Sequence, residues 1–329
     1  MSDIVIRIED SLRLVSTVLS LTQWNELIQR QRPHGTHAHI RSTARALGDF
    51  RHHPAVLSMQ GLLDEGAPLE AMFGLVVHLP WPSLELATPP KWMPAGWNGQ
   101  LADFYEQASV ADWWMQDQSA WELAQRQAER VLGEVNFKPF LGQFFGEINE
   151  SFVFYPNISL PSDRDLGIRQ MSRNEIITMI PPRLAWGDSA PWPFDEDVAY
   201  VHRSALAQLV RLLLLAKLRD NPEVSKEASK ISLPVSDTFR ARYPTWAQQF
   251  VVIFTIAAVE IYLEQLDPKE SKAYLQDQVR NHQMKWLPST VDVLKRYMKE
   301  QERGKFESIL DYLPIFPRQL KVAQRILSI

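Results

Sequence analysis

The sequence contains no cysteine among its 329 residues. That absence excludes disulfide bonds, thiolate metal sites and cysteine nucleophiles together. It is also consistent with a cytoplasmic protein, because disulfides persist mainly in oxidising compartments. Glycine is scarce as well, with 13 residues, and no glycine-rich phosphate-binding loop is found.

An excess of basic charge is also missing. With 35 basic and 39 acidic residues the net charge is −4, and no stripe of lysine and arginine alternates with aromatic residues. We therefore expect no nucleic-acid partner. The N-terminal segment shows no basic region followed by an apolar one and predicts no signal peptide. The most apolar tract, Tyr243–Val259, is shorter than the roughly 20 residues of a bilayer-spanning helix, so we expect a core helix and no membrane partner.

Tryptophan and proline are abundant, with 11 and 22 residues. Several tryptophans stand in proline-rich intervals, which indicates loops held by aromatic packing. Trp186 and Trp192 flank one such loop. They are either packing anchors or the aromatic border of a surface that binds a peptide or another ligand.

Apolar residues recur at helical spacing through most of the chain. A short strand is predicted at Ile4–Ile8, and two more at Ser151–Leu160 and Glu175–Ile180, with polar turn residues between them. The fold class is therefore α+β and predominantly α-helical. Residues 1–150 are predicted to form a mainly helical N-terminal lobe, and residues 151–329 a small sheet plus a helical C-terminal lobe.

A buried central helix is predicted directly after the strands, over residues 195–218. Three acids precede an apolar run that contains one histidine, His202. Acids stabilise the positive N-terminal end of a helix, and the apolar run favours burial. The acids are Asp195, Glu196 and Asp197.

Several short motifs follow one another along the chain. They are Phe50-x-x-His53-Pro54-Ala55-Val56, Leu101-x-x-Phe104-Tyr105 followed by Trp113-Trp114, Asn136-Phe137-x-x-Phe140 before a Phe-Phe-Gly end, the strands between 151 and 180, Val201-His202, and an apolar helix after Trp246. In these motifs, from about residue 5 to about residue 300, the chain resembles a bacterial family with a domain of unknown function, regarded as gluzincin-like zinc peptidases. The resemblance implies a gluzincin-like body with a small strand region before the central helix.

The family's zinc motif is degenerate in this sequence. In H-E-x-x-H, two histidines one turn apart bind zinc and the glutamate acts as general base. The resemblance places His202 at the first histidine, Arg203 at the base and Leu206 at the second histidine. It places Ile253 at the third ligand, normally a glutamate, while Glu260 lies two turns further on.

The resemblance therefore implies a pseudoenzyme with no catalytic residue, no bound metal and no cofactor. Catalytic zinc needs three protein ligands and a water, and the charge of Arg203 would repel the metal. The implied function is peptide or protein binding, or regulation, through the former active-site cleft. Trp186, Trp192 and Glu260 are its candidate residues.

Two other functions remain open. One is an active zinc-dependent peptidase whose ligands stand at other positions, and the other is a structural subunit with a filled cleft. Without a zinc site, we expect His202 to be a core histidine, and Arg203 to pair with Asp197 or Glu196 or to lie at the surface. The sequence does not predict the oligomeric state.

Three histidines, His34, His37 and His39, lie within six residues of one another. With Glu26 or Asp49 they could bind a metal ion adventitiously. Their proline- and glycine-containing surroundings favour a solvated polar turn instead. A serine nucleophile has no support, because no G-x-S-x-G motif occurs.

Overall fold

The computed structural model describes residues 2–31, 37–160, 164–185 and 189–327. It divides the chain into two compact units. The first comprises Met1–Val135 and Glu150–Val201, and the second Asn136–Asn149 and His202–Ile329. One small sheet and many helices make the chain α+β and predominantly helical, which confirms the predicted fold class.

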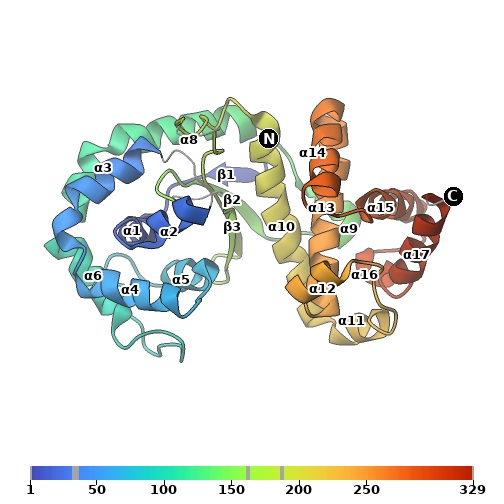
Figure 1. Cartoon of the computed structure of the whole chain (residues 1–329), viewed down its shortest axis with the longest axis horizontal. Helices are drawn as coiled ribbons and strands as arrows, with labels where there is room; N and C mark the ends of the chain where they lie inside the picture. The colour runs from blue at the N-terminus through green and yellow to red at the C-terminus, as the bar shows by residue number, and fades with distance from the viewer. Residues whose placement is uncertain (1, 32–36, 161–163, 186–188, 328–329) are drawn as a thin grey trace. The chain divides into compact units, whose positions relative to one another are not determined.

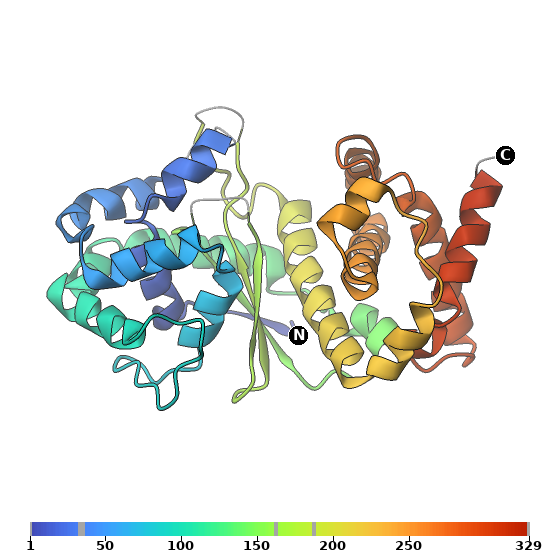
Figure 2. The ribbon, with the colours of Figure 1, turned by 60° about the horizontal axis from the view of Figure 1, so that its bottom comes forward.

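The sheet belongs to the first unit and has four strands in the order β1-β2-β4-β3. They are β1 (Ile4–Ile6), β2 (Ser151–Pro156), β3 (Leu166–Gln170) and β4 (Glu175–Ile180). β1 pairs with β2 and β2 with β4 in parallel, whereas β3 and β4 are antiparallel. All residues of β4 are buried, as expected for a strand whose two faces are covered, and the four strands lie side by side in Figure 2.

Helix α1 (Asp10–Leu19) lies at the centre of the first unit, ringed by helices in Figure 1. Nine of its ten residues are buried, and it packs against α4, α5 and α6. Arg13, Ser16 and Thr17 are among the buried residues. The sequence predicted a helix here, but not one buried on every side.

The remaining helices of the first unit lie between β1 and β2 in the chain. They are α2 (Trp24–Gln31), α3 (Ala38–Ala46), the 3-10 helix η1 (Gly48–Phe50), α4 (Pro54–Asp64), α5 (Leu69–Val76), α6 (Trp97–Gln107), α7 (Val110–Gln116) and α8 (Gln118–Leu132). α8 packs on β1 and β2 and supplies part of the pocket described below.

The second unit is helical in the part that the structure describes. It contains α9 (Lys138–Phe145), most of α10 (Val198–Asp220), α11 (Pro222–Ala228), α12 (Asp237–Arg242), α13 (Trp246–Leu266), α14 (Pro268–Arg280), α15 (Leu287–Glu302), α16 (Ile309–Tyr312) and α17 (Phe316–Leu327). α13 packs against α14 and α15, and a capping box of Thr245 and Gln248 fixes its start.

The predicted central helix is α10. Asp197 Oδ1 accepts a hydrogen bond from the backbone N–H of Tyr200 at 2.8 Å, so one predicted acid stabilises the start of the helix. α10 and α13 are long and apolar enough to cross a membrane by length and composition alone, with mean hydropathy of 1.3 and 1.5. α13 is thus longer than the apolar tract Tyr243–Val259. However, 56% of the apolar stretch of α10 and 61% of that of α13 are buried, and the core helices of many proteins pass the same test.

The structure differs from the sequence-based division in two ways. The predicted boundary at residue 150 assigned the strands to the second lobe, whereas β2, β3 and β4 lie in the first unit. Helix α9, assigned to the first lobe, lies in the second unit. The reason is sheet pairing, because Phe152, Val153 and Phe154 of β2 pair with β1 at the start of the chain.

Candidate functional site

His202 lies buried on α10, with 4% of its surface exposed. Its Nδ1 lies 3.0 Å from the hydroxyl oxygen of Tyr262 on α13, and the two rings are stacked with centroids 6.0 Å apart. Phe137 contacts the imidazole edge-on. His202 is thus hydrogen-bonded within packed aromatic side chains.

The other motif positions are packed as well. Leu206 and Ile253 are both fully buried. The guanidinium of Arg203 lies 5.6 Å from the ring centroid of Tyr274, while the predicted partner Asp197 forms an ion pair with Arg183. These positions therefore lie among packed side chains.

The structure brings Tyr262 beside His202, a residue that the sequence did not single out. Tyr262 lies about 13 Å along the axis of α13 from Ile253, given a rise of about 1.5 Å per residue. A tyrosine carries no motif signal in this sequence. Only the packing of α13 places its hydroxyl at the imidazole.

Glu260 lies on α13 with 4% of its surface exposed. Its Oε1 accepts a hydrogen bond from Ser271 Oγ at 2.7 Å, and its Oε2 has no hydrogen-bond partner among the described residues. Burial raises the pKa of Glu260 above its usual value. Glu260 therefore joins α13 to α14 within the second unit.

Over residues 2–31, 37–160, 164–185 and 189–327, no group of three or more His, Asp or Glu side chains is placed to hold a metal ion. Of the bunched histidines, His34 lies outside the described residues. Trp186, a predicted cleft residue, also lies outside them.

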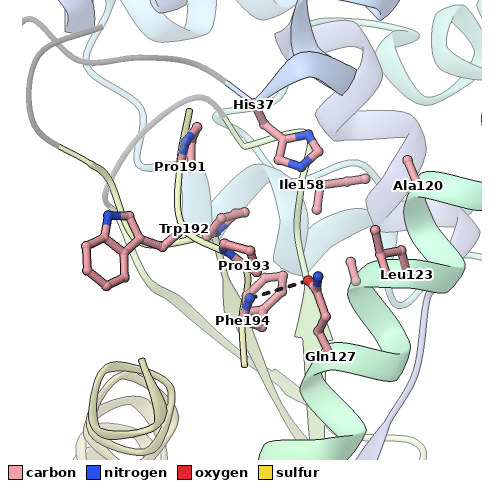
Figure 3. Close-up of a pocket in the computed structure, with 11 residues that line it drawn as sticks. His37, Ala120, Leu123, Gln127, Ile158, Pro191, Trp192, Pro193 and Phe194 are labelled. Carbon is pink, nitrogen blue, oxygen red and sulfur yellow. Dashed lines mark hydrogen bonds between the residues drawn. The ribbon is translucent and has the colours of Figure 1, made fainter. Parts of the chain in front are cut away.

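The first unit contains a pocket of about 160 Å³ (Figure 3). Helix α8 forms one wall, the segment before α10 forms another, and single residues from β2's exit and the start of α3 complete it. The lining residues are His37, Ala120, Leu123, Ala124, Gln127, Ile158, Pro182, Pro191, Trp192, Pro193 and Phe194. Of the predicted cleft residues that the structure describes, Trp192 lines this pocket and Glu260 does not.

Backbone hydrogen bonds and an ion pair hold the proline-rich wall of this pocket. The backbone N–H of Trp192 donates to the carbonyl of Arg183 at 2.8 Å. The guanidinium of Arg183 lies 5.3 Å from the indole centroid and pairs with Asp197. Since Asp197 also caps α10, the wall is fixed to the start of that helix.

The polar side chains of the pocket are uncharged. Burial lowers the pKa of His37 to about 4, and the charge of Arg41 acts in the same direction, so the imidazole is neutral near pH 7. Its Nδ1 accepts a hydrogen bond from the backbone N–H of His39 at 3.1 Å and caps α3. The described side chains of the pocket are therefore suited to apolar contacts and uncharged hydrogen bonds.

The size of the pocket limits what it can hold. Sites that enclose whole small-molecule ligands have volumes of about 300–1,000 Å³. A pocket of about 160 Å³ is instead suited to one or two side chains of a larger partner. Leu123 and Trp192 are 45% and 39% exposed, so the apolar surface continues outside the pocket.

His39 corrects the prediction of a solvated turn. It is 3% exposed, contacts the carboxylate of Asp117 through Nδ1, and its Nε2 accepts a hydrogen bond from Trp121 Nε1 at 3.2 Å. The turn residues around it in the sequence concealed this burial, because Asp117 and Trp121 are far away in the chain.

Comparison of the chain with protein-family models, with curated proteins and with solved structures finds no match.

Proposed function

We propose that this chain is a non-catalytic, metallopeptidase-like protein that binds a peptide or protein partner. The metallopeptidase-like part of the proposal rests on the motif resemblance of the sequence. The binding site that we propose is the pocket of the first unit, in place of a cleft at the degenerate motif. Its support is the exposed apolar pair Leu123 and Trp192 over a pocket with fixed walls.

Contacts within the first unit hold the rim of this pocket in place, so no partner is needed to form it. The indole of Trp192 is held by Arg183, and the main chain of Phe194 is held by Gln127. A rigid aromatic side chain at the rim of an apolar pocket is typical of binding hot spots. An apolar side chain of a partner would enter the pocket while its main chain crosses Leu123 and Trp192.

The non-catalytic part of the proposal has a separate basis. His202 is hydrogen-bonded to Tyr262, and Leu206 and Ile253 supply no metal-binding atom. A catalytic zinc needs three ligands that converge at about 2.0–2.3 Å from one point. Arg203 also places a positive charge at the general-base position.

Selection from a phage-displayed library of random peptides tests the binding function. We expect enriched peptides to share an apolar anchor residue and to bind the purified protein in calorimetry. Leu123→Asp should weaken this binding at least about tenfold, because a charge would enter an apolar contact. Leu57→Asp is the matched control, since Leu57 is a 55% exposed leucine of α4 that does not line the pocket.

Two outcomes would contradict the binding proposal. Either no peptide is enriched above an unrelated protein, or binding is equally strong in Leu123→Asp and in the wild type. Metal analysis of protein purified without chelator tests the non-catalytic part. Stoichiometric zinc that is lost in His202→Ala would instead support the active zinc-dependent peptidase.

A further inference from the structure

Three side chains that line the pocket carry nitrogen or oxygen atoms, namely His37, Gln127 and Trp192. What each of them can still donate or accept determines which ligand chemistry the pocket complements. The hydrogen bonds that they already make settle this for each one.

The amide oxygen of Gln127 already accepts a hydrogen bond. Figure 3 shows its amide directed at the main chain of Phe194, and the backbone N–H of Phe194 donates to Oε1 at 3.4 Å. Because a backbone N–H can only donate, the amide atom that faces it must be the oxygen. The NH₂ group of Gln127 then remains as a hydrogen-bond donor in the pocket.

His37 is restricted in the same way. Its Nδ1 accepts from the backbone N–H of His39, so Nδ1 carries no hydrogen. The ring is neutral, and its single hydrogen therefore lies on Nε2. His37 offers the pocket a second donor, and the indole of Trp192 can only donate.

The described lining side chains therefore present donors, and their two acceptors, Gln127 Oε1 and His37 Nδ1, each already accept a backbone N–H. The N–H groups of a ligand would have to share these two acceptors with the backbone N–H groups that they already bind, and a buried donor without a partner weakens binding. A ligand with carbonyl oxygens and no N–H groups would satisfy the available donors.

Resting on the proposed function, we propose that the pocket binds a proline-containing peptide segment. Proline has a carbonyl acceptor, no backbone N–H, and an apolar ring. Proline-containing segments also dock on aromatic-lined grooves in an extended conformation with a low entropic cost. The proline ring would lie on the apolar floor formed by Ala120, Ala124 and Ile158, and a carbonyl would accept from Gln127.

Three probe peptides that carry the same label test this proposal by fluorescence anisotropy. The first is fluorescein-labelled Leu-Pro-Leu-Pro with an amidated C-terminus. The second replaces both prolines with alanine, which restores an N–H at these two positions, and the third replaces them with N-methylalanine, which again has no N–H there. We expect the proline and N-methylalanine peptides to bind about tenfold more tightly than the alanine peptide.

Gln127→Glu tests the donor on the protein side. The carboxylate keeps an oxygen for the N–H of Phe194 but removes the NH₂ group. We expect the proline peptide to bind about tenfold more weakly to this variant and the alanine peptide to lose less. Gln118→Glu, at the exposed first residue of the same helix, introduces the same charge away from the pocket and should change neither affinity.

The outcomes of these experiments distinguish the preference for proline from peptide binding itself. Equal affinity for the three probes, or unchanged affinity in Gln127→Glu, would show that the inference about proline is wrong while leaving peptide binding intact. The same holds if selected library peptides bind and the proline probe does not. Absence of binding by the probes and by all library peptides would contradict the proposed function itself.

Discussion

The hydroxyl of Tyr262 lies 3.0 Å from Nδ1 of His202. The histidine at the start of the degenerate motif is thus hydrogen-bonded to a side chain of α13, and the stacked rings fix its orientation. The bond connects two long apolar helices at a point where both bury most of their neighbouring residues. This contact gives His202 a structural role that can be measured.

Tyr262→Phe should destabilise the protein by about 1 kcal/mol, because it removes one buried hydrogen bond and keeps the ring. Urea unfolding followed by circular dichroism measures the change in the free energy of unfolding. Tyr243→Phe is the control, since the hydroxyl of Tyr243 has no hydrogen-bond partner among the described residues. Equal stability of the two variants would show that the contact with His202 contributes nothing.

Arg13 provides a second stability prediction. Its guanidinium lies between the rings of Trp114 and Trp121, 4.5 and 4.7 Å from their centroids, and only 4% of the residue is exposed. Among the described residues no carboxylate forms an ion pair with it. The two aromatic faces and the carbonyl of Trp114 therefore stabilise a buried charge.

Replacing Arg13 with lysine and with methionine should change the free energy of unfolding by clearly different amounts. Arg13→Lys replaces a flat cation by a compact, strongly hydrated ammonium, which we expect to cost about 2 kcal/mol or more. Arg13→Met removes the charge and fills the same space, so its stability should lie within about 1 kcal/mol of the wild type or above it. Urea unfolding ranks the variants, and a lysine variant more stable than the methionine variant would refute this view of the site.

The fold class could be predicted from sequence because it depends on local patterns. Helical spacing and β-branched residues identified β1, β2, β4 and the helix α10 within a few residues. β3 was missed because its residues stand next to polar turn residues and only pairing with β4 makes them a strand. The parallel pairing of β1 with β2 was not predictable from local patterns, since a long stretch of chain separates the two strands.

The candidate pocket could be predicted only in part. Trp192 was found because tryptophan beside two prolines is unusual, whereas Leu123 and Gln127 look like ordinary surface positions of a helix. Their role depends on which segment packs against α8. Arg13 was missed for the same reason, because a charged residue in a helix gives no sign that two distant tryptophans enclose it.

Glu260 predicts a pH dependence of stability. Burial raises its pKa above the usual 4.5, while the hydrogen bond from Ser271 acts in the opposite direction and the charge of Glu264 adds to the increase. A raised pKa in the folded state means that folding favours the protonated acid. Its contribution is therefore most favourable below about pH 4.5 and is lost as the pH rises through the folded-state pKa.

Glu260→Gln should consequently be more stable than the wild type near pH 7, and the difference should disappear as the pH falls towards 4.5. Thermal unfolding across this pH range measures it. Glu307→Gln, at an exposed position, should show no such trend. A difference that stays constant with pH would mean that the ionisation of Glu260 is not responsible.

His39 should make the protein sensitive to acid. Burial lowers its pKa from 6.5 to about 3, and the charge of Arg13 acts in the same direction. The hydrogen bonds are consistent with a neutral imidazole whose hydrogen is on Nδ1. Its Nε2 accepts a hydrogen bond from Trp121, and its Nδ1 faces the carboxylate of Asp117. That carboxylate favours the protonated form, but a protonated ring would lose the bond from Trp121.

Stability from His39 is thus fully present above pH 6.5 and lost as the pH falls towards 3, because the unfolded chain takes up a proton that the folded chain excludes. The slope is about 1 kcal/mol per pH unit below pH 6. His39→Gln has no charge to gain, so its stability should fall less between pH 6.5 and 4.5 than that of the wild type, even if it is lower at pH 7. The exposed His52→Gln should keep the wild-type slope in urea unfolding. A wild-type slope in His39→Gln would instead assign the acid sensitivity to other groups, of which the half-buried His37 is the first to examine.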